Sequence, residues 1–366
     1  MNKNAGLVLV NGTHDSVQGP RARALFGDRA RIVYKEHGRF RSIRDIWRAL
    51  RKEKSGWVYC IDMGFPSSLL AAARKRLSPR LKLIYEIGDP ARPLLANQAR
   101  SALEVGFAHQ VDKRLPAVAD QLVFRGTYLA DYFAKISARE RLPLWTWLPD
   151  GVDCEVFRPR RDDAAVAELR REHKLENRFV VGLVGNIHHN PQHNLFYGWE
   201  LAEALALIPP ELQVTGVVVG DGPGRHVLEA ARERLQLGER LRLIGRVLHD
   251  QVSLWMNVFD VGLSTQTDDP VGWGRTTAKL PEYLACGTPV LCSDVGEAHR
   301  LLKESGQTVP YHGFRDEEYP ARLAERLMLL AGQNLDSQRQ HNRELALQLF
   351  DYKILRRKLQ ELLDEL

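Results

Sequence analysis

The sequence predicts an α/β protein made of two doubly wound domains, each with a parallel sheet between layers of helices. Short apolar runs rich in valine, isoleucine and leucine alternate with segments of helical periodicity. This alternation pauses in a charged stretch after residue 159 and then restarts. At 366 residues the chain is long enough for two domains that each bury a core.

In the first half, each predicted strand is a short apolar run bounded by turn residues or by a helical pattern. The predicted strands span 7–11, 30–34, 57–61, 82–87, 121–124 and 144–148. Helices are predicted in most of the gaps, including 66–76 and a long one over 94–115.

The same pattern returns in the second half. Strands are predicted at 179–184, 214–219, 241–244, 261–264 and 289–292, with helices near 195–207, 224–235 and 276–285. Residues 351–366 are strongly helical in pattern. Ligands of such sheets bind beyond the carboxyl ends of the strands, so functional residues are expected in the loops there.

Charge is unevenly distributed. Residues 1–150 hold 26 Lys and Arg against 14 Asp and Glu, a net +12, whereas residues 151–366 hold 26 against 32, a net −6. Within 42–54, apolar residues recur at helical spacing among basic ones. This predicts a basic amphipathic helix, which fits either an anionic membrane surface or a helix packed on the core with a solvated basic face. No nucleic acid partner is expected, because the basic stretches lack a binding module or interleaved aromatics.

Several classes of protein are not expected. No apolar run approaches the ~18 residues of a membrane span, and the N-terminus lacks the pattern of a signal peptide. The four cysteines, scattered without metal-ligand spacing, predict neither a disulfide framework nor a zinc site. His188, His189 and His193 lack the spacing of a zinc pair and are interpreted as a polar loop. A cytoplasmic protein without metal or other cofactor is therefore expected.

The most informative segment is 272–291, where a glycine-flanked turn leads into a helix that carries Lys279 and Glu282. Free N–H groups at a helix start bind phosphate, and the helix dipole favours the negative charge. One turn further along, Glu282 can accept hydrogen bonds from two ribose hydroxyls. The layout suits a nucleoside diphosphate, as in a nucleotide-sugar.

Four ordered segments carry a resemblance to a known family: Lys-x-x-Glu-Tyr-Leu-Ala-x-Gly-x-Pro-Val at 279–290, Leu-Pro-Asp-Gly-Val-Asp at 148–153 with Phe-Arg-Pro at 157–159, Val-Gly-Asp-Gly-Pro at 219–223, and Ser-Asp-Val-Gly-Glu at 293–297. They resemble segments of retaining glycosyltransferases of the GT-B fold, family-4 type (glycosyl transferases group 1). The N-terminal half resembles that family only in its strand and helix order.

This resemblance implies two Rossmann-like domains that face a central cleft. Residues 1–155 would bind the acceptor, 156–350 would bind the nucleotide-sugar, and 351–366 would cross back to the first domain. The implied catalytic residues are Lys279, Glu282, Arg275 and Asp89. The implied donor-binding residues are Gly12, Gly185, Asn186, Gly220, Asp221, Gly222, Arg246, Gly274, Thr276, Thr277, Lys279, Leu280 and Glu282.

The sequence departs from the family at two places. The acidic residue that the family carries eight positions before Glu282 is Gly274 here, and Asp268 or Asp269 is the candidate substitute. Asn186 stands where the family has an arginine, and Gln192 or His193 where it has a lysine. Neutral donors bind phosphate more weakly than Arg or Lys. We expect Arg275, four residues from Lys279 on the predicted helix, to compensate.

Candidate acceptor residues follow the strands of the first domain. The loop after the first strand carries His14 and Asp15, and Arg125 follows the strand at 121–124. An anionic acceptor group could bind Arg125. For the loop, an ordinary turn is an equally good interpretation. Asp89 resembles the end of a His-Asp pattern in the family, but the histidine is absent.

The resulting hypothesis is a metal-independent retaining glycosyltransferase that moves a sugar from a nucleoside diphosphate to a glycan or lipid-linked acceptor. Cell-surface polysaccharide or lipopolysaccharide assembly is the expected setting, in the cytoplasm or on the inner face of the membrane. Two alternatives remain: a non-catalytic GT-B subunit that binds a nucleotide or glycan, and a nucleotide-sugar epimerase. Fold alone does not decide among them.

Overall fold

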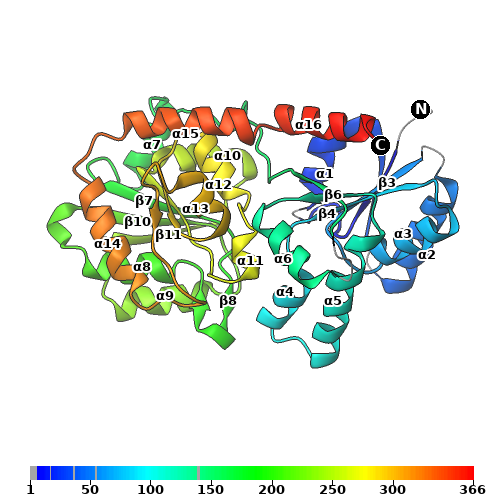
Figure 1. Cartoon of the computed structure of the whole chain (residues 1–366). Coiled ribbons are helices and arrows are strands. Elements are labelled where there is room, and N and C mark those ends of the chain that lie inside the picture. Colours follow the sequence, from blue (N-terminus) through cyan, green and yellow to red (C-terminus); the bar gives the residue numbers. More distant parts are fainter. Residues whose placement is uncertain (1–5, 17, 36–37, 54–55, 138–140) are drawn as a thin grey trace. The chain divides into compact units, whose positions relative to one another are not determined.

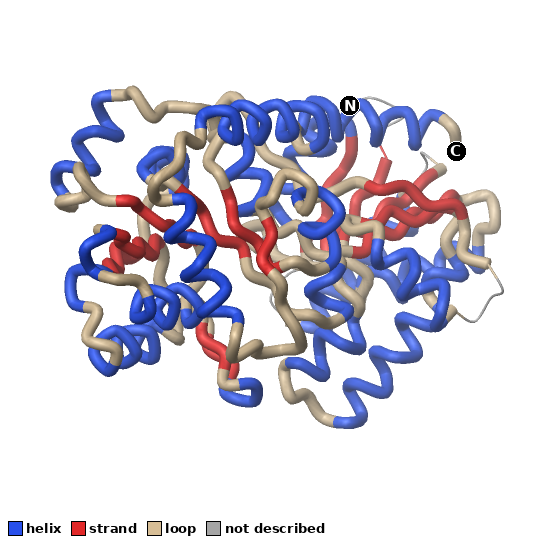
Figure 2. Tube along the Cα trace, turned by 60° about the vertical axis from the view of Figure 1, so that its left-hand side comes forward, coloured by secondary structure: helices blue, strands red, loops and turns tan. Residues whose placement is uncertain are grey.

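The chain forms two compact α/β units (Figure 1). The first comprises residues 1–151, 273–275 and 352–366, and the second comprises 152–272 and 276–351. The computed structural model describes every residue except 1–5, 17, 36–37, 54–55 and 138–140. In each unit helices cover both faces of the strands (Figure 2). The predicted pair of doubly wound domains is confirmed.

The first unit is built on a six-stranded parallel sheet with the order β2-β1-β3-β4-β5-β6. Its strands β1, β3 and β4 are mainly apolar and are buried apart from the first residues of β3 and β4, as expected for a parallel sheet covered on both faces. Its strands are β1 Gly6–Val10, β2 Ala30–Tyr34, β3 Trp57–Ile61, β4 Lys82–Ile87, β5 Gln121–Phe124 and β6 Leu144–Trp147. Its helices are α1 Gln18–Phe26, α2 Arg39–Lys52, α3 Ser67–Leu77, α4 Ala91–Asn97, α5 Ala102–Arg114, α6 Tyr128–Ile136 and the C-terminal α16 Tyr352–Asp364.

Helix α16 belongs to the first unit although it ends the chain. Its leucines Leu355, Leu359 and Leu362 are buried in one apolar cluster with Val8 and Val10 of β1. Burial of this apolar stripe fixes the C-terminal helix to the sheet of the first unit.

The second unit has a six-stranded parallel sheet of order β11-β10-β7-β12-β13-β14 and a small antiparallel hairpin. The strands are β7 Phe179–Val184, β10 Val214–Val219, β11 Leu241–Gly245, β12 Val261–Ser264, β13 Val290–Ser293 and β14 Thr308–Val309, and the hairpin pairs β8 His189–Asn190 with β9 Leu195–Phe196. The helices are α7 Ala164–Glu172, α8 Trp199–Leu207, α9 Arg225–Arg234, α10 His249–Val258, α11 Pro270–Trp273, α12 Lys279–Ala285, α13 Gly296–Leu302, α14 Tyr319–Leu330 and α15 Asp336–Leu349.

Two predicted helices were too long. The helix expected over 94–115 is two helices, α4 and α5, because Ala99 adopts a positive φ of 53° and Ser101 begins a new helix. Ser101 and Glu104 form a reciprocal capping box there. The helix expected over 195–207 is β9 followed by α8, since Gly198 has a φ of 88° between them.

The helix expected over 276–285 begins three residues later, at Lys279. Thr277 has a φ of 53°, which interrupts a right-handed helix at that point. Arg275 therefore lies outside α12, and the expectation that Arg275 and Lys279 share one helix face is wrong.

The basic amphipathic helix is confirmed as α2, and its apolar residues pack on the core. Ile46 and Leu50 are fully buried, and Trp47 packs against the same core cluster. Phe40, near the start of the same helix, is 87% exposed, so contact of α2 with a membrane surface stays a prediction. In the described part of the chain, no helix has the length and apolar character needed to cross a bilayer.

Candidate functional site

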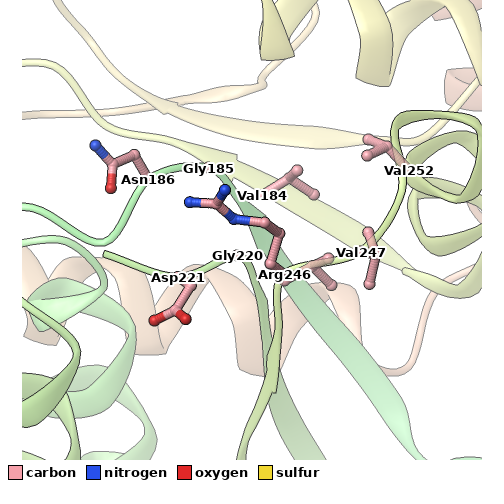
Figure 3. A pocket seen from close by; sticks show the side chains of 9 residues that line it. Val184, Gly185, Asn186, Gly220, Asp221, Arg246, Val247 and Val252 are labelled. Atoms are coloured by element: carbon pink, nitrogen blue, oxygen red, sulfur yellow. The ribbon is translucent and has the colours of Figure 1, made fainter. Parts of the chain in front are cut away.

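A pocket of about 400 Å³ lies at the carboxyl ends of β7, β10 and β11 in the second unit (Figure 3). This is the edge where parallel sheets of this type bind ligands. Five predicted donor-binding residues line it together. The lining residues are Val184, Gly185, Asn186, Val219, Gly220, Asp221, Arg246, Val247 and Val252.

Glycines bring the loops of this pocket close together. Gly220 has a φ of 144°, and a Cβ placed on it would collide with the carbonyl oxygen of Gly185. A Cβ on Gly222 would collide with the side-chain oxygen of Asn186. Glycine is therefore required at positions 220 and 222 by the close approach of these two loops.

Arg246 is the one cation among the described residues that line this pocket. Its side chain is exposed and makes no hydrogen bond or ion pair with any other described residue. Figure 3 shows its guanidinium directed across the pocket toward Asn186. Asn186 and Asp221 are also exposed, and Asp221 accepts a hydrogen bond from the backbone N–H of Gly222 at 2.8 Å. A positive side chain thus lies close to the place where the family arginine is missing.

Lys279, the first residue of α12, is held near the end of β7 by Tyr197. The ammonium donates to the phenolic oxygen of Tyr197 at 2.6 Å and lies 4.3 Å from the centre of its ring. Tyr197 in turn donates to the carbonyl of Val184 at 2.7 Å. Sequence patterns did not indicate Tyr197, which was placed inside the predicted helix over 195–207 and lies between β9 and α8 in the structure. This chain of contacts connects the Lys279 ammonium to the wall of the pocket.

Glu282 lies one turn along α12 and is half-buried. Its carboxyl group makes no hydrogen bond with any described residue. Burial raises its pKa to about 8, while the nearby Lys279 ammonium acts in the opposite direction. The hydroxyls of Thr276 and Thr277 are buried and also lack hydrogen-bond partners in the described chain. The start of α12 thus presents several polar groups that a ligand could satisfy.

Arg275 and Asp89 pair with each other in the first unit. Nε and Nη2 of Arg275 donate to the two carboxylate oxygens of Asp89 at 2.7 and 2.9 Å. This bidentate pair occupies both residues in the described structure. Compensation for the missing phosphate ligands by Arg275 stays a prediction, and Arg246 is a second candidate for that role.

The residue in place of the missing acid cannot carry a side chain. A Cβ on Gly274 would come within 2.6 Å of Leu129, and a Cβ on Gly126 would collide with the Gly274 carbonyl. Asp269, the proposed substitute, is buried and accepts from the Thr267 hydroxyl at 2.6 Å and the Gly272 N–H at 3.0 Å. Asp269 therefore stabilises its own loop, and the role of Asp268 or Asp269 as the substitute acid stays a prediction.

A buried charge network lies at the carboxyl ends of β3, β4 and β5 in the first unit. Glu86 is fully buried and accepts from Nε of Arg21 at 2.8 Å, Nε of Arg125 at 2.9 Å and the Tyr59 hydroxyl at 2.7 Å. Burial alone would raise its pKa, but the two guanidinium groups hold it at about 2. Arg125 also donates to Asp62 at 2.8 Å.

The Arg125 side chain is only 8% exposed. Its guanidinium therefore neutralises the carboxylates of Glu86 and Asp62. The expected contact of Arg125 with an anionic acceptor stays a prediction, and in this structure the guanidinium is paired with these two carboxylates. Sequence patterns missed Arg21, Glu86 and Asp62, since an isolated charge in an apolar run does not reveal its partners. A positive φ of 58° at Asp62, just after β3, marks the strained turn that brings its carboxylate to Arg125.

The other predicted residues lie on loops. His14 and Asp15 are exposed and paired, with Nδ1 of His14 2.8 Å from the Asp15 carboxylate. Gly12 lies in the first unit, so its assignment to the donor stays a prediction. His193 stacks on Phe314 at 4.1 Å. Among the described residues, no group of three or more His, Cys, Asp or Glu side chains is arranged to hold a metal ion.

Residues 178–331 match the model of a known family, glycosyl transferases group 1. A 2-deoxystreptamine glucosyltransferase from Streptomyces kanamyceticus is 34% identical over 178 residues, which are 44% of this chain and 41% of that protein. The chain thus matches less than half the length of that relative.

Solved structures extend the likeness to nearly the whole fold. Anabaena Alr3699/HepE, in complex with UDP and glucose, has a TM-score of 0.76 at 18% identity and covers 98% of this chain and 99% of its own. Sucrose-phosphate synthase from Thermosynechococcus elongatus has a TM-score of 0.75 at 17% identity, over 99% of this chain and 98% of its own. WaaG, a glycosyltransferase involved in lipopolysaccharide biosynthesis, has a TM-score of 0.67 at 13% identity, over 96% and 98%. The predicted GT-B fold is confirmed.

Proposed function

We propose that this chain transfers a sugar from a nucleoside-diphosphate sugar to a glycan or lipid-linked acceptor, because its residues 178–331 match the model of the glycosyl transferases group 1 family. The observation that carries the proposal is the half-buried Glu282 carboxyl group, which has no hydrogen-bond partner among the described residues. It lies on the same short helix as Lys279, whose ammonium is held beside the end of β7. A UDP-sugar is the donor we expect, since HepE is known in complex with UDP and glucose.

In this proposal the nucleoside lies in the pocket formed by β7, β10 and β11, with its ribose hydroxyls donating to Glu282. The diphosphate accepts hydrogen bonds from the Lys279 ammonium and from the hydroxyls of Thr276 and Thr277. Those two buried hydroxyls lack partners in the described chain, and a phosphate oxygen would satisfy them. Arg246 adds the positive charge that Asn186 does not supply.

The proposed reaction breaks the bond between the anomeric carbon and the diphosphate oxygen and forms a bond to the acceptor oxygen on the same face. The acceptor hydroxyl proton passes to the departing diphosphate, so no protein nucleophile is needed. Negative charge grows on the diphosphate as the bond breaks. A fixed ammonium at Lys279 stabilises that charge more than it stabilises the bound donor, which lowers the barrier. No metal is required in this proposal.

A non-catalytic nucleotide-binding subunit is the second candidate, and two observations favour it. Asn186 replaces a cationic phosphate ligand, and Gly274 leaves no side chain where the family has an acid. Such a protein would bind the nucleotide-sugar without transfer. A role in surface polysaccharide or lipopolysaccharide assembly, as for WaaG, belongs to the catalytic proposal only.

Thermal unfolding in the presence of UDP-, GDP-, CMP- and dTDP-sugars tests the donor site. A ligand at about 100 times its Kd should add about 2.7 kcal/mol to the free energy of unfolding, which is visible as a higher Tm. We expect one nucleotide class to stabilise the wild type and to lose this effect in Glu282→Ala. The matched control is Glu233→Ala, which removes an exposed carboxylate from α9.

Three outcomes of that experiment are informative. Stabilisation by one class, lost only in Glu282→Ala, supports the proposed site. Equal stabilisation of both variants would place the nucleotide elsewhere. Binding with no transfer to a panel of glycan acceptors, and with no conversion of the donor to its epimer, would favour the non-catalytic candidate.

Donor affinity is expected to rise with pH in the neutral range. The ribose hydroxyls donate to an ionised carboxylate, whereas burial holds the pKa of unliganded Glu282 at about 8. Binding must therefore remove a proton below that pKa, and the apparent Kd for a UDP-sugar should fall about tenfold between pH 7 and pH 9. Isothermal titration calorimetry at several pH values measures this slope. Glu282→Gln should bind weakly and without the slope, and an unchanged slope in that variant would contradict the assignment.

A further inference from the structure

The first unit contains a cavity of about 600 Å³ that no donor residue lines. It opens where β1 and β3 end, at Asn11 and at Met63–Gly64, and extends between α4 and α5. Figures 1 and 2 show these two helices side by side in the first unit. Its volume lies within the range of about 300–1,000 Å³ that is typical of small-molecule sites.

The walls of this cavity are mainly apolar. Leu94 and Leu95 of α4 face Leu103, Phe107 and Val111 of α5. Two of these side chains are strongly exposed: Leu103 is 88% and Phe107 is 53% accessible to solvent. Exposed apolar side chains that continue into an apolar cavity are typical of a ligand-binding surface.

The end of the cavity nearest the sheet is polar. The Asn11 amide lines it, and its side-chain oxygen is buried without a hydrogen-bond partner in the described chain. A Cβ on Gly64 would collide with the amide nitrogen of Asn11, so glycine is needed for this orientation. Lys35 and Glu104 also line the cavity, with opposite charges. A hydroxyl donor bound here would satisfy Asn11.

We propose that this cavity binds an amphiphilic acceptor, with its hydroxyl-bearing head at Asn11 and its apolar chain between α4 and α5. The inference rests on the proposed function and narrows its acceptor to the lipid-linked class. A free, fully polar glycan would leave the apolar walls of α4 and α5 in contact with water. An apolar chain removes that surface from water, which is favourable in proportion to the area buried.

Binding of n-alkyl β-D-glucosides to the full chain, below their micelle concentrations, tests this site. Calorimetry should give saturable 1:1 binding, with affinity rising about fourfold per added methylene from hexyl until the cavity is filled. Glucose alone should not bind measurably. A rise of less than 1.5-fold per methylene would overturn the proposal.

Three variants locate the binding. Phe107→Asp places a charge at the cavity wall and should weaken decyl glucoside binding at least tenfold. Leu77→Asp, at an exposed leucine of α3 outside the cavity, should leave that binding unchanged. Asn11→Ala should weaken every chain length by the same factor. Equal losses in Phe107→Asp and Leu77→Asp would indicate unspecific detergent adsorption and contradict the site. Tm values of all variants establish that they are folded.

Two further measurements separate the alternatives. UDP-sugar binding is measured in the same samples. If the wild type binds a UDP-sugar but no alkyl glucoside, the acceptor site is rejected and the proposed donor site is retained. Loss of UDP-sugar binding in Glu282→Ala with retained glucoside binding would show the two sites to be independent. Co-sedimentation with phosphatidylglycerol vesicles tests membrane docking. If the wild type co-sediments, Phe107→Asp does not, and no 1:1 glucoside binding is found, the apolar surface of α4 and α5 would be assigned to membrane docking instead.

Discussion

Replacement of Lys279 by alanine is expected to lower kcat/KM for sugar transfer about 10²–10³-fold. This is the usual effect of removing one fixed group that stabilises developing negative charge. The Lys279 ammonium is positioned before any ligand binds, because it donates to Tyr197 at 2.6 Å and lies over that ring. Its charge therefore needs little reorganisation when the diphosphate departs. Initial rates with the donor class found by thermal unfolding measure the loss.

The matched control is Lys303→Ala, which removes an exposed ammonium after α13 and should change kcat/KM less than twofold. Tyr197→Phe keeps the ring beneath the ammonium but removes the hydroxyl. We expect a smaller loss, about tenfold, since the cation–π contact remains. A loss below fivefold in Lys279→Ala would reject the assigned role of this residue.

Replacement of Arg125 by methionine is expected to lower the free energy of unfolding by about 3–5 kcal/mol, the usual cost of removing one partner from a buried ion pair. Glu86 is fully buried, and without Arg125 it keeps only Arg21 as a cationic partner. Asp62 loses its guanidinium as well. Urea unfolding at pH 7.5 measures the effect, with Arg80→Met, an exposed arginine of the same unit, as the control. That control should change stability by less than about 0.5 kcal/mol.

The pH dependence of this loss distinguishes charge from packing. Arg21 and Arg125 hold the pKa of Glu86 at about 2, below the 4.5 of an unperturbed glutamate. The wild-type carboxylate thus contributes stability above pH 4.5 that is lost only as the pH falls toward 2. In Arg125→Met the pKa of Glu86 must rise, so the gap between variant and wild type should narrow from pH 7.5 to pH 5. A gap of constant size would assign the effect to packing.

Most strands of both sheets were predicted well, because each is marked by an apolar pattern within one short segment. The strands at 30–34, 57–61, 82–87, 121–124, 179–184, 214–219 and 261–264 lie at the predicted residues. A buried parallel strand is a short apolar run, and that pattern depends on neighbouring residues only. Helix ends were less predictable: Ala99 and Thr277 adopt positive φ values that their residue types do not favour.

In the candidate site, too, features set by local spacing were predictable and contacts between distant segments were not. The motif around Lys279 and Glu282 indicated nucleotide chemistry because helix geometry fixes the spacing of these two residues. The partners of such residues did not follow from any motif: Tyr197 lies 82 positions from Lys279, and Glu86 lies 39 positions from Arg125. No local pattern encodes which distant loop supplies a hydroxyl or a guanidinium.

By itself, then, the sequence determined the two parallel sheets, the glycine-rich turns of the pocket and the pair on α12, because each depends on spacing within one segment. Tertiary structure alone decided that Arg125 neutralises Glu86, and that Gly274 has no room for a side chain beside Leu129. Both outcomes follow from burial: a charge taken out of water must find its counter-charge, and a close-packed contact excludes an added atom.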